Sequence, residues 1–221
     1  MGRFQIRQIR KWIGLILLWG GIVPTVQAQE VDYTTWLRQG VVYEVNERLD
    51  VSGGLEWRTK SHLRTTDRWG LDVGAKYAVL SFLKLGGGYE IHYRNRGGDG
   101  WKFRHRYHAD GTLSGRWGRV KLALRERFQH TWDDVENELR LRSRLKLAYD
   151  IRHCKLEPYA SVEMYNSLNR GDGFDVARMR YRAGFSLPLF SENWEADVFY
   201  CRQWEADGRK NIFGVDCVYK F

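Results

Sequence analysis

Cations recur at every second position in several parts of this chain. In residues 138–150 (ELRLRSRLKLAYD), Arg140, Arg142, Arg144 and Lys146 alternate with leucines. Guanidinium groups bind carboxylates and phosphates through paired N–H donors, so a row of them predicts either anion binding or a ladder of ion pairs. Side chains of a β-strand alternate between two faces, so this spacing puts the cations on one face and the leucines on the other.

Other segments also carry polar and charged residues at every second position, which we call the polar phase. Arginines outnumber carboxylates on this phase. The candidate basic wall is Arg104, Arg106, Arg125, Arg127, Arg140, Arg142, Arg144, Arg178, Arg180 and Arg182. The carboxylates on this phase are Glu56, Asp72, Glu90, Asp110, Glu163, Asp197 and Asp216. Rough hairpin registers put Glu163 level with Arg140 and Arg178. They put Glu90 near Arg104.

Acid–base chemistry has fewer candidates. His92 and His108 share the polar phase with Glu90 and Asp110, and Ser161 also lies on it. A histidine oriented by a carboxylate can act as a general base. No nucleophile elbow and no zinc-ligand spacing accompanies these residues, so we expect no catalytic residue, metal or cofactor. A lipid- or peptide-hydrolysing enzyme remains the weakest alternative.

The first 28 residues have the layout of a secretory signal peptide. Four basic residues precede an apolar run of about a dozen residues, and Val26-Gln27-Ala28 follows as a cleavage signal. The mature chain, 29–221, would keep a net charge of about +5, because the leader removes four basic residues and no acidic ones. Export argues against nucleic acid as a partner. The three cysteines form no CxxC, and one disulfide with unassigned pairing stays open.

Eleven segments of the mature chain alternate apolar and polar residues. They are 33–45, 49–58, 69–77, 83–93, 101–114, 120–125, 138–150, 156–165, 177–187, 194–204 and 211–221. Most are longer than the five or six residues common in soluble sheets, and they match the nine to eleven needed for a tilted membrane strand. The pattern predicts an all-β, antiparallel transmembrane barrel of about 10–12 strands. A soluble sandwich is the alternative.

Aromatic residues and connections support the barrel. Aromatics cluster near both ends of the segments, as expected at two membrane interfaces. Short turns near 46–47, 80–81, 115–118, 152–153 and 190–193 alternate with longer polar loops, as in outer-membrane barrels. Single-chain bacterial barrels usually have an even number of strands, so we expect ten or twelve, with twelve favoured.

The last strand carries its own signal. Phe213, Val215, Cys217, Tyr219 and Phe221 alternate up to a terminal phenylalanine. Outer-membrane barrels resemble one another here, which predicts recognition by the barrel assembly machinery.

The chain resembles a bacterial family of uncharacterised outer-membrane β-barrels, classed as a domain of unknown function. The resemblance rests on DYTTWL, VVYEVNERLDVSGGLEWR, FRHRY, LRLRSRLKL, KLEPYASVEMY and VYKF. It implies the fold and a bacterial outer-membrane location. We also expect outer-membrane lipid as a partner of the apolar wall. It implies no activity and no functional residues.

Two functional hypotheses follow from the charged lumen. Arginines without carboxylate partners would need water or an anion, which favours a narrow pore or binding channel for anionic small molecules or oligosaccharides. Arginine and glutamate could instead fill a closed structural barrel as a hydrogen-bonded ladder. Neutralising Arg140, Arg142 and Arg144 together is expected to weaken the anion preference of a conducting barrel.

Overall fold

The computed structural model describes residues 31–169, 175–189, 191, 193–206 and 208–221. The expected signal peptide, residues 1–28, lies outside the described residues. The strands are β1 (Val31–Asn46), β2 (Leu49–Lys60), β3 (Thr65–Leu80), β4 (Leu83–Asn95), β5 (Trp101–Trp117), β6 (Val120–Trp132), β7 (Asn137–Tyr149), β8 (Glu157–Ser167), β9 (Asp175–Pro188), β10 (Trp194–Glu205) and β11 (Gly208–Lys220). One short 3₁₀ helix, η2 (Gly97–Asp99), lies between β4 and β5.

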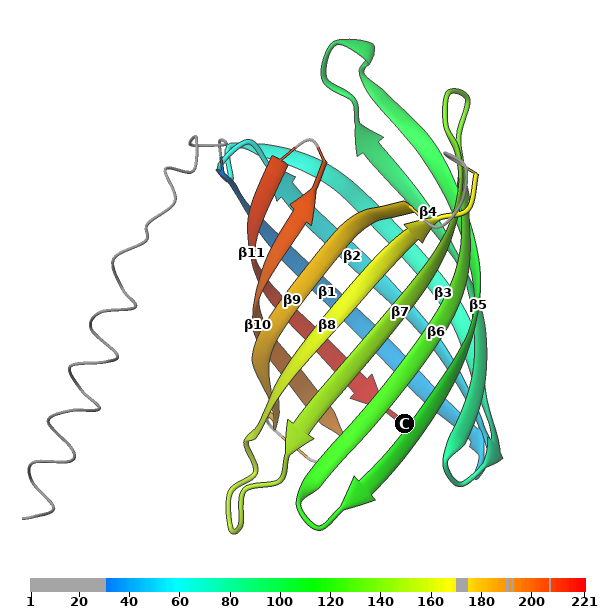
Figure 1. Ribbon diagram of the computed structural model, residues 1–221, viewed down its shortest axis with the longest axis vertical. Helices are drawn as coiled ribbons and strands as arrows, with labels where there is room; N and C mark the ends of the chain where they lie inside the picture. Colours follow the sequence, from blue (N-terminus) through cyan, green and yellow to red (C-terminus); the bar gives the residue numbers. More distant parts are fainter. Residues whose placement is uncertain (1–30, 170–174, 190, 192, 207) are drawn as a thin grey trace, which may run out of the picture. The chain divides into compact units, whose positions relative to one another are not determined.

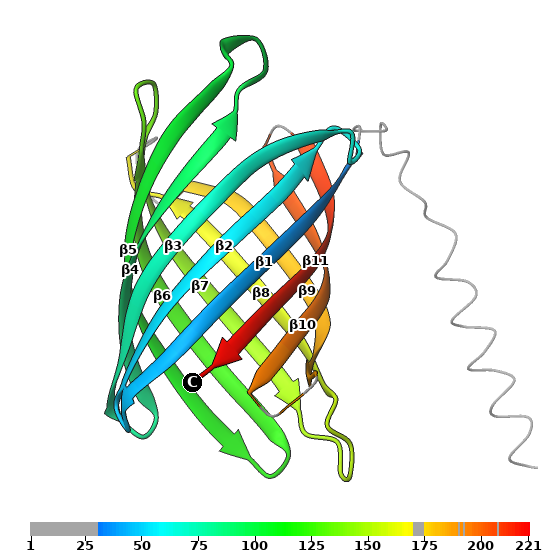
Figure 2. The ribbon, with the colours of Figure 1, turned by 180° about the vertical axis from the view of Figure 1, so that it is seen from behind.

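The eleven strands form one closed barrel (Figure 1). Each strand is antiparallel to its neighbour in sequence, and β1 closes the barrel by pairing in parallel with β11 over Val31↔Arg209 to Val42↔Lys220. The all-β barrel is confirmed, but the expected even strand number is wrong. A closed sheet only needs every edge paired, and a parallel seam pairs the two edges of an odd-numbered sheet. Figure 2 shows β1 and β11 running side by side in the same direction.

The two alternating phases become the two faces of the barrel wall. Apolar side chains such as Leu55, Leu71 and Phe103 are more than half exposed on the outside. The polar phase lies inside, where Arg104, Asp110 and Glu163 are buried. This is the distribution expected when the outer wall contacts lipid, because hydrocarbon offers no partner to a charged group.

Connections at the two ends of the barrel differ. The end that carries the C-terminus, marked in Figure 1, has the connections 47–48, 81–82, 118–119, 150–156 and 189–193. We call this the turn end. The loop end carries Val31 and the connections after β2, β4, β6, β8 and β10. The short turn expected at 152–153 is instead the middle of a seven-residue connection, 150–156, in which His153 has a φ of 59°.

A small group of buried apolar side chains packs inside the barrel. It includes Trp36, Phe199, Cys201 and Ile212 on β1, β10 and β11. Cys154, Cys201 and Cys217 are all free thiols. Among the described residues, no helix is long and apolar enough to cross a membrane.

Candidate functional site

The barrel encloses a cavity of about 960 Å³ to which all eleven strands contribute. Eighteen Arg and Lys residues line it, against twelve Asp and Glu residues. This volume lies at the upper end of the range for small-molecule sites. The cavity therefore has both the size and the excess positive charge to hold an anionic solute.

The structure places the candidate residues as follows. All ten arginines of the candidate basic wall line the cavity, as do Glu56, Asp72, Glu90, Asp110, Glu163 and Asp216. Asp197 is absent from the lining. Its carboxylate accepts a hydrogen bond of 2.6 Å from the Tyr159 hydroxyl. Of the candidate assembly signal, Phe213 and Phe221 are more than half exposed at the outer wall and the turn end.

The cross-strand partners expected from the sequence for Glu163 and Glu90 are wrong. Glu163 pairs across the sheet with Arg144 and Arg180, and not with Arg140 and Arg178. Glu90 pairs with Arg106, and not with Arg104. The midpoints expected for the connections differ from the observed ones by one or two residues. In an antiparallel hairpin, an error of one residue in the midpoint moves the cross-strand partner of a residue by two positions along the next strand. A register shift by an even number of residues keeps every side chain on the same face of the sheet. The inward placement was therefore right, and only the cross-strand partners were wrong.

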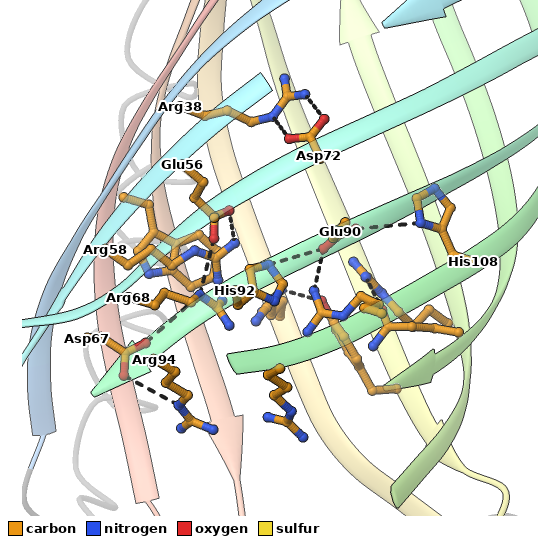
Figure 3. Close-up of a pocket in the computed structure, with 18 of the residues that line it drawn as sticks. Arg38, Glu56, Arg58, Asp67, Arg68, Asp72, Glu90, His92, Arg94 and His108 are labelled. Atoms are coloured by element: carbon orange, nitrogen blue, oxygen red, sulfur yellow. Dashed lines mark hydrogen bonds and ion pairs between the residues drawn. The ribbon is translucent and has the colours of Figure 1, made fainter. Parts of the chain in front are cut away.

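Glu90 is the centre of one buried ion-pair group. Its carboxylate lies 2.7 Å from Nη1 of Arg106, 3.3 Å from Nε2 of His92 and 3.5 Å from Nδ1 of His108. Figure 3 shows Glu90 between His92 and His108. These contacts come from β4 and β5, where the three partners stand on the inward phase. A carboxylate with several donors is well satisfied, which is what a buried charge requires.

A second group lies nearer the loop end, where Glu56 accepts from Arg58 at 2.5 Å and lies 3.1 Å from Arg68 (Figure 3). On the adjacent part of the wall, Arg38 forms a two-point contact with Asp72, with distances of 3.1 and 2.7 Å. The paired N–H donors of arginine match the two oxygens of a carboxylate in this geometry. These groups therefore behave as a structural ladder across β1, β2 and β3.

Glu163 on β8 is surrounded by more arginines than it can neutralise. Arg125 and Arg142 donate to its Oε1 at 2.7 and 2.9 Å, and the Tyr165 hydroxyl donates to Oε2 at 2.9 Å. Its register partners Arg144 and Arg180 form no ion pair with it. One carboxylate thus stands among four arginines.

Three arginines of this region lack a carboxylate partner. Across the described part of the chain, no Asp or Glu oxygen lies within 4.0 Å of the guanidinium groups of Arg144, Arg180 and Arg182. Arg180 donates to Gln203 at 2.5 Å and also to the Tyr165 hydroxyl. Arg182 lies over the Phe199 ring, 3.9 Å from its centroid. We call these three residues the unpaired arginines. Their guanidinium groups suit the carboxylate or phosphate of an anionic ligand.

The comparisons with known proteins agree with this architecture. A family model described as a protein of unknown function, DUF2490, matches residues 33–213. The chain belongs to the DUF2490 family. This DUF2490 barrel is also similar in fold to the translocator domain of the autotransporter NalP from Neisseria meningitidis, with a TM-score of 0.50 and 15% identity over 93% of this chain and 92% of that chain. The search of curated proteins finds no match.

The protein is thus an outer-membrane-type β-barrel. The likeness to the translocator domain concerns the fold alone, because identity is low. The arginines and carboxylates of the cavity therefore have to be interpreted from their own geometry in the DUF2490 barrel.

The acid–base candidates do not assemble into a catalytic group. Ser161 pairs in register with Arg182 and Lys146, and not with either histidine. Within the described residues, no hydroxyl group is hydrogen-bonded to His92 or His108, and no set of three His, Cys, Asp or Glu side chains is arranged to hold a metal. The two histidines instead complete the ion-pair group around Glu90.

Several lining residues were not identified from the sequence. Arg38, Arg68 and Arg94 line the cavity, as do Trp36 and Tyr165. Arg68 shares its phase with Asp72, so the alternation of β3 could have revealed it. Arg38 lies in a segment with weak alternation, next to Gln39 and Gly40. Trp36 was not identified because aromatic residues of a membrane barrel are usually expected on its lipid-facing side. Here its ring lies 3.6 Å from the Arg58 guanidinium.

Proposed function

We propose that this protein resides in the bacterial outer membrane and forms a narrow channel that binds and passes small anionic solutes, including acidic oligosaccharides. Its C-terminal strand would be recognised by the barrel assembly machinery, and outer-membrane lipid would surround its apolar wall. The observation that carries the proposal is the set of three unpaired arginines in the cavity. A half-buried cation without a carboxylate needs water or an anion, so a solute with carboxylate or phosphate groups finds a partner there.

A closed structural barrel is the second candidate. It is favoured by the ion pairs of Glu56, Glu90 and Asp72, which join different strands and give each of these carboxylates a counter-charge. In this case the arginines would serve only to fill the lumen. The two candidates differ in whether ions cross the folded barrel.

Conductance of the refolded mature protein in a planar bilayer under a salt gradient separates these candidates. We expect a steady current with an anion-selective reversal potential. A variant with Arg144→Gln, Arg180→Gln and Arg182→Gln should move the reversal potential toward zero, because it removes three lining cations that have no counter-charge of their own. Arg140 and Arg142 are less suitable targets, since each already pairs with a carboxylate.

A charge-matched control is available at the turn end. Arg48→Gln, Arg119→Gln and Arg152→Gln together remove the same charge from residues that do not line the cavity. Their reversal potential should equal that of the native protein. No current from protein shown to be folded and inserted would overturn the channel and support the closed barrel. If the reversal potential shifts equally in both triple variants, the unpaired arginines do not determine the selectivity.

A further inference from the structure

Two arginines stand on the outer wall of the barrel, where apolar side chains prevail. Among the described strand residues, Arg202 of β10 and Arg209 of β11 are the two Arg or Lys residues on the outward phase. Arg202 pairs in register with the exposed Tyr181 of β9, and Arg209 pairs with the exposed Trp204. A cation on the lipid face is costly near the middle of the membrane and tolerated near its surfaces, so its depth and its partners decide its role.

Both arginines lie near the loop end. Arg202 is three residues before Glu205, the end of β10, which is about 10 Å along an extended strand. Arg209 is the second residue of β11. Exposed aromatic residues surround them, namely Tyr33, Tyr181 and Trp204. Aromatic belts mark the depth of the lipid head groups, so the long arginine side chains are within reach of the head groups of one leaflet.

Neither arginine has a counter-charge in the wall. Within the described residues, no Asp or Glu oxygen lies within 4.0 Å of either guanidinium group. The Nε atom of Arg202 is buried and has no hydrogen-bond acceptor there. Arg209 lies over the Trp204 ring, with its Cζ atom 5.7 Å from the ring centroid. An unpaired cation beside hydrocarbon is costly, so acceptors from outside the protein would stabilise both groups.

The two arginines are placed to act on one ligand. In the register of β10 with β11, Arg202 is opposite Asn211, and Arg209 is two residues before Asn211 on the same face. Such diagonal neighbours lie about 7–8 Å apart, a distance that long side chains can bridge. A group with several oxygens can therefore accept hydrogen bonds from both guanidinium groups. We define Arg202, Arg209 and Asn211 as the outer arginine site.

The surroundings and the charge of the site specify the ligand. The outer wall of an outer-membrane-type barrel faces lipid, so the oxygens come from a lipid head group. Toward the middle of the wall the site continues into the exposed Phe213 and Val198, which can contact acyl chains. A phosphate monoester carries a charge of about −1.5 to −2 at neutral pH, which matches two arginines. A phosphodiester carries a single charge and leaves one arginine unneutralised.

We infer that the outer arginine site binds the phosphate monoester head group of a membrane lipid in the leaflet at the loop end. Arg202 and Arg209 donate to the phosphate oxygens, and the acyl chains lie along the apolar wall below them. The inference rests on the membrane location proposed above and not on the channel, because the site lies on the opposite face of the wall from the cavity. It adds a selective head-group contact to the general contact between lipid and the apolar wall.

Native mass spectrometry of the refolded mature protein in a neutral detergent tests the inference, because it counts the lipids that each protein retains. Phosphatidic acid serves as the monoester lipid, and phosphatidylglycerol with the same acyl chains serves as the diester lipid. We expect one phosphatidic acid per protein, bound at least about fivefold more tightly than phosphatidylglycerol. Arg202→Gln with Arg209→Gln should weaken the binding of phosphatidic acid by at least about tenfold, because both cations are lost. The corresponding double substitution to Lys keeps the charge and should weaken it less.

Two control variants separate this site from other cations of the chain. Arg48→Gln with Arg119→Gln removes the same charge from exposed residues in connections of the turn end. The triple variant of the unpaired arginines removes charge from the lumen. Both should retain phosphatidic acid as the native chain does. All these variants are expected to fold, since none of the substituted residues at the outer wall or the turn end has an ion pair to lose within the described part of the chain.

Equal binding of the two lipids, or unchanged binding of phosphatidic acid by Arg202→Gln with Arg209→Gln, would overturn the inference. Displacement of phosphatidic acid by an equal concentration of inorganic phosphate would overturn it too, because the ligand would then be a free anion. Insertion of the protein into phosphatidylcholine vesicles checks the membrane location separately. A protein that inserts but shows no preference for the monoester lipid contradicts this inference alone, whereas a protein that does not insert contradicts the membrane location as well.

Discussion

At the level of single residues, the inner wall makes room for one aromatic ring. Phe199 of β10 points into the barrel, and its neighbours across the sheet on β9 and β11 are Gly184 and Gly214. A Cβ on Gly214 would lie 2.0 Å from Cζ of Phe199, well inside van der Waals contact. Glycine at this position therefore allows the ring, and the Arg182 guanidinium above it, to occupy the lumen.

Gly214→Ala is expected to lower the free energy of unfolding by about 1–3 kcal/mol, because the Phe199 ring must leave its position in a packed wall. Urea unfolding of the barrel in lipid vesicles measures the change. Gly115→Ala, where no atom lies within 4 Å of the added Cβ, is the control and should have little effect. Combining Gly214→Ala with Phe199→Leu should recover part of the loss. Equal stability of Gly214→Ala and Gly115→Ala would contradict this account.

At the level of elements, a network of ion pairs joins the connections at the loop end. Arg96, after β4, pairs with Asp133, after β6. Arg104 of β5 lies 2.7 Å from Glu136 and 2.9 Å from Glu138. Oδ1 of Asp133 also accepts the backbone N–H groups of Val135 and Glu136, at 2.9 and 2.8 Å. These contacts hold the 133–136 loop over the cavity-lining residues of β5 and β7.

The pKa of Asp133 makes this loop sensitive to acid. Burial alone would raise the pKa of the carboxyl, but the backbone donors of Val135 and Glu136, together with Arg96, lower it below its ordinary value of 3.8. A lowered carboxyl pKa stabilises the loop above the unfolded pKa, and the stabilisation is lost as pH falls through the folded pKa. The loop should therefore be intact at pH 5 and open only below 3.8.

Amide resonances of Val135 and Glu136, followed by NMR against pH, report this opening and should shift with a midpoint below 3.8. Asp133→Ala should open the loop at neutral pH, since the acceptor is removed. Asp134→Ala provides the control, because Asp134 is exposed and its neighbour keeps the contacts. A midpoint at or above 3.8 would mean that the carboxylate is not held by these donors.

At the level of the whole molecule, the parallel seam between β1 and β11 decides the topology. An odd number of strands puts the beginning of β1 at the loop end and the end of β11 at the turn end. Phe221 continues the seam, where its N–H donates to the carbonyl oxygen of Val42 at 2.9 Å. The seam aligns Gln39 with Cys217, both on the outer face.

Gln39→Cys is therefore expected to form a disulfide with native Cys217 under mild oxidation, because neighbouring strands lie about 4.8 Å apart, which is within the range of Cα separations that a disulfide can span. Mass spectrometry of proteolytic fragments detects the bond, in a Cys154→Ser background that removes the exposed thiol. Val41→Cys, which aligns with Tyr219, should not form it. Efficient bonding of Val41→Cys and none of Gln39→Cys, in folded protein, would mean a different seam.

The sequence alone determined which face is inside for the strands with clear alternation. Alternation with period two follows from the geometry of the extended chain, so the inward placement of Arg104, Arg125 and Arg182 could be predicted without a structure. Strand length and the terminal aromatic residues likewise indicated a membrane barrel. Each predicted segment therefore overlaps one strand from β1 to β11, although 120–125 covers less than half of β6, and the candidate wall lies along one cavity.

Only the tertiary structure decided closure, register and pairing. Nothing local in β1 or β11 shows that they meet in parallel, because that contact joins the two ends of the chain. The cross-strand partners of Glu163 depend on the midpoints of the connections before and after β8. A small error in these midpoints paired Glu163 with the wrong arginines. Whether Arg144 has a counter-charge depends on three strands at once. Side-chain direction is a property of neighbouring residues, whereas ion pairing is a property of strands brought together by the closed sheet.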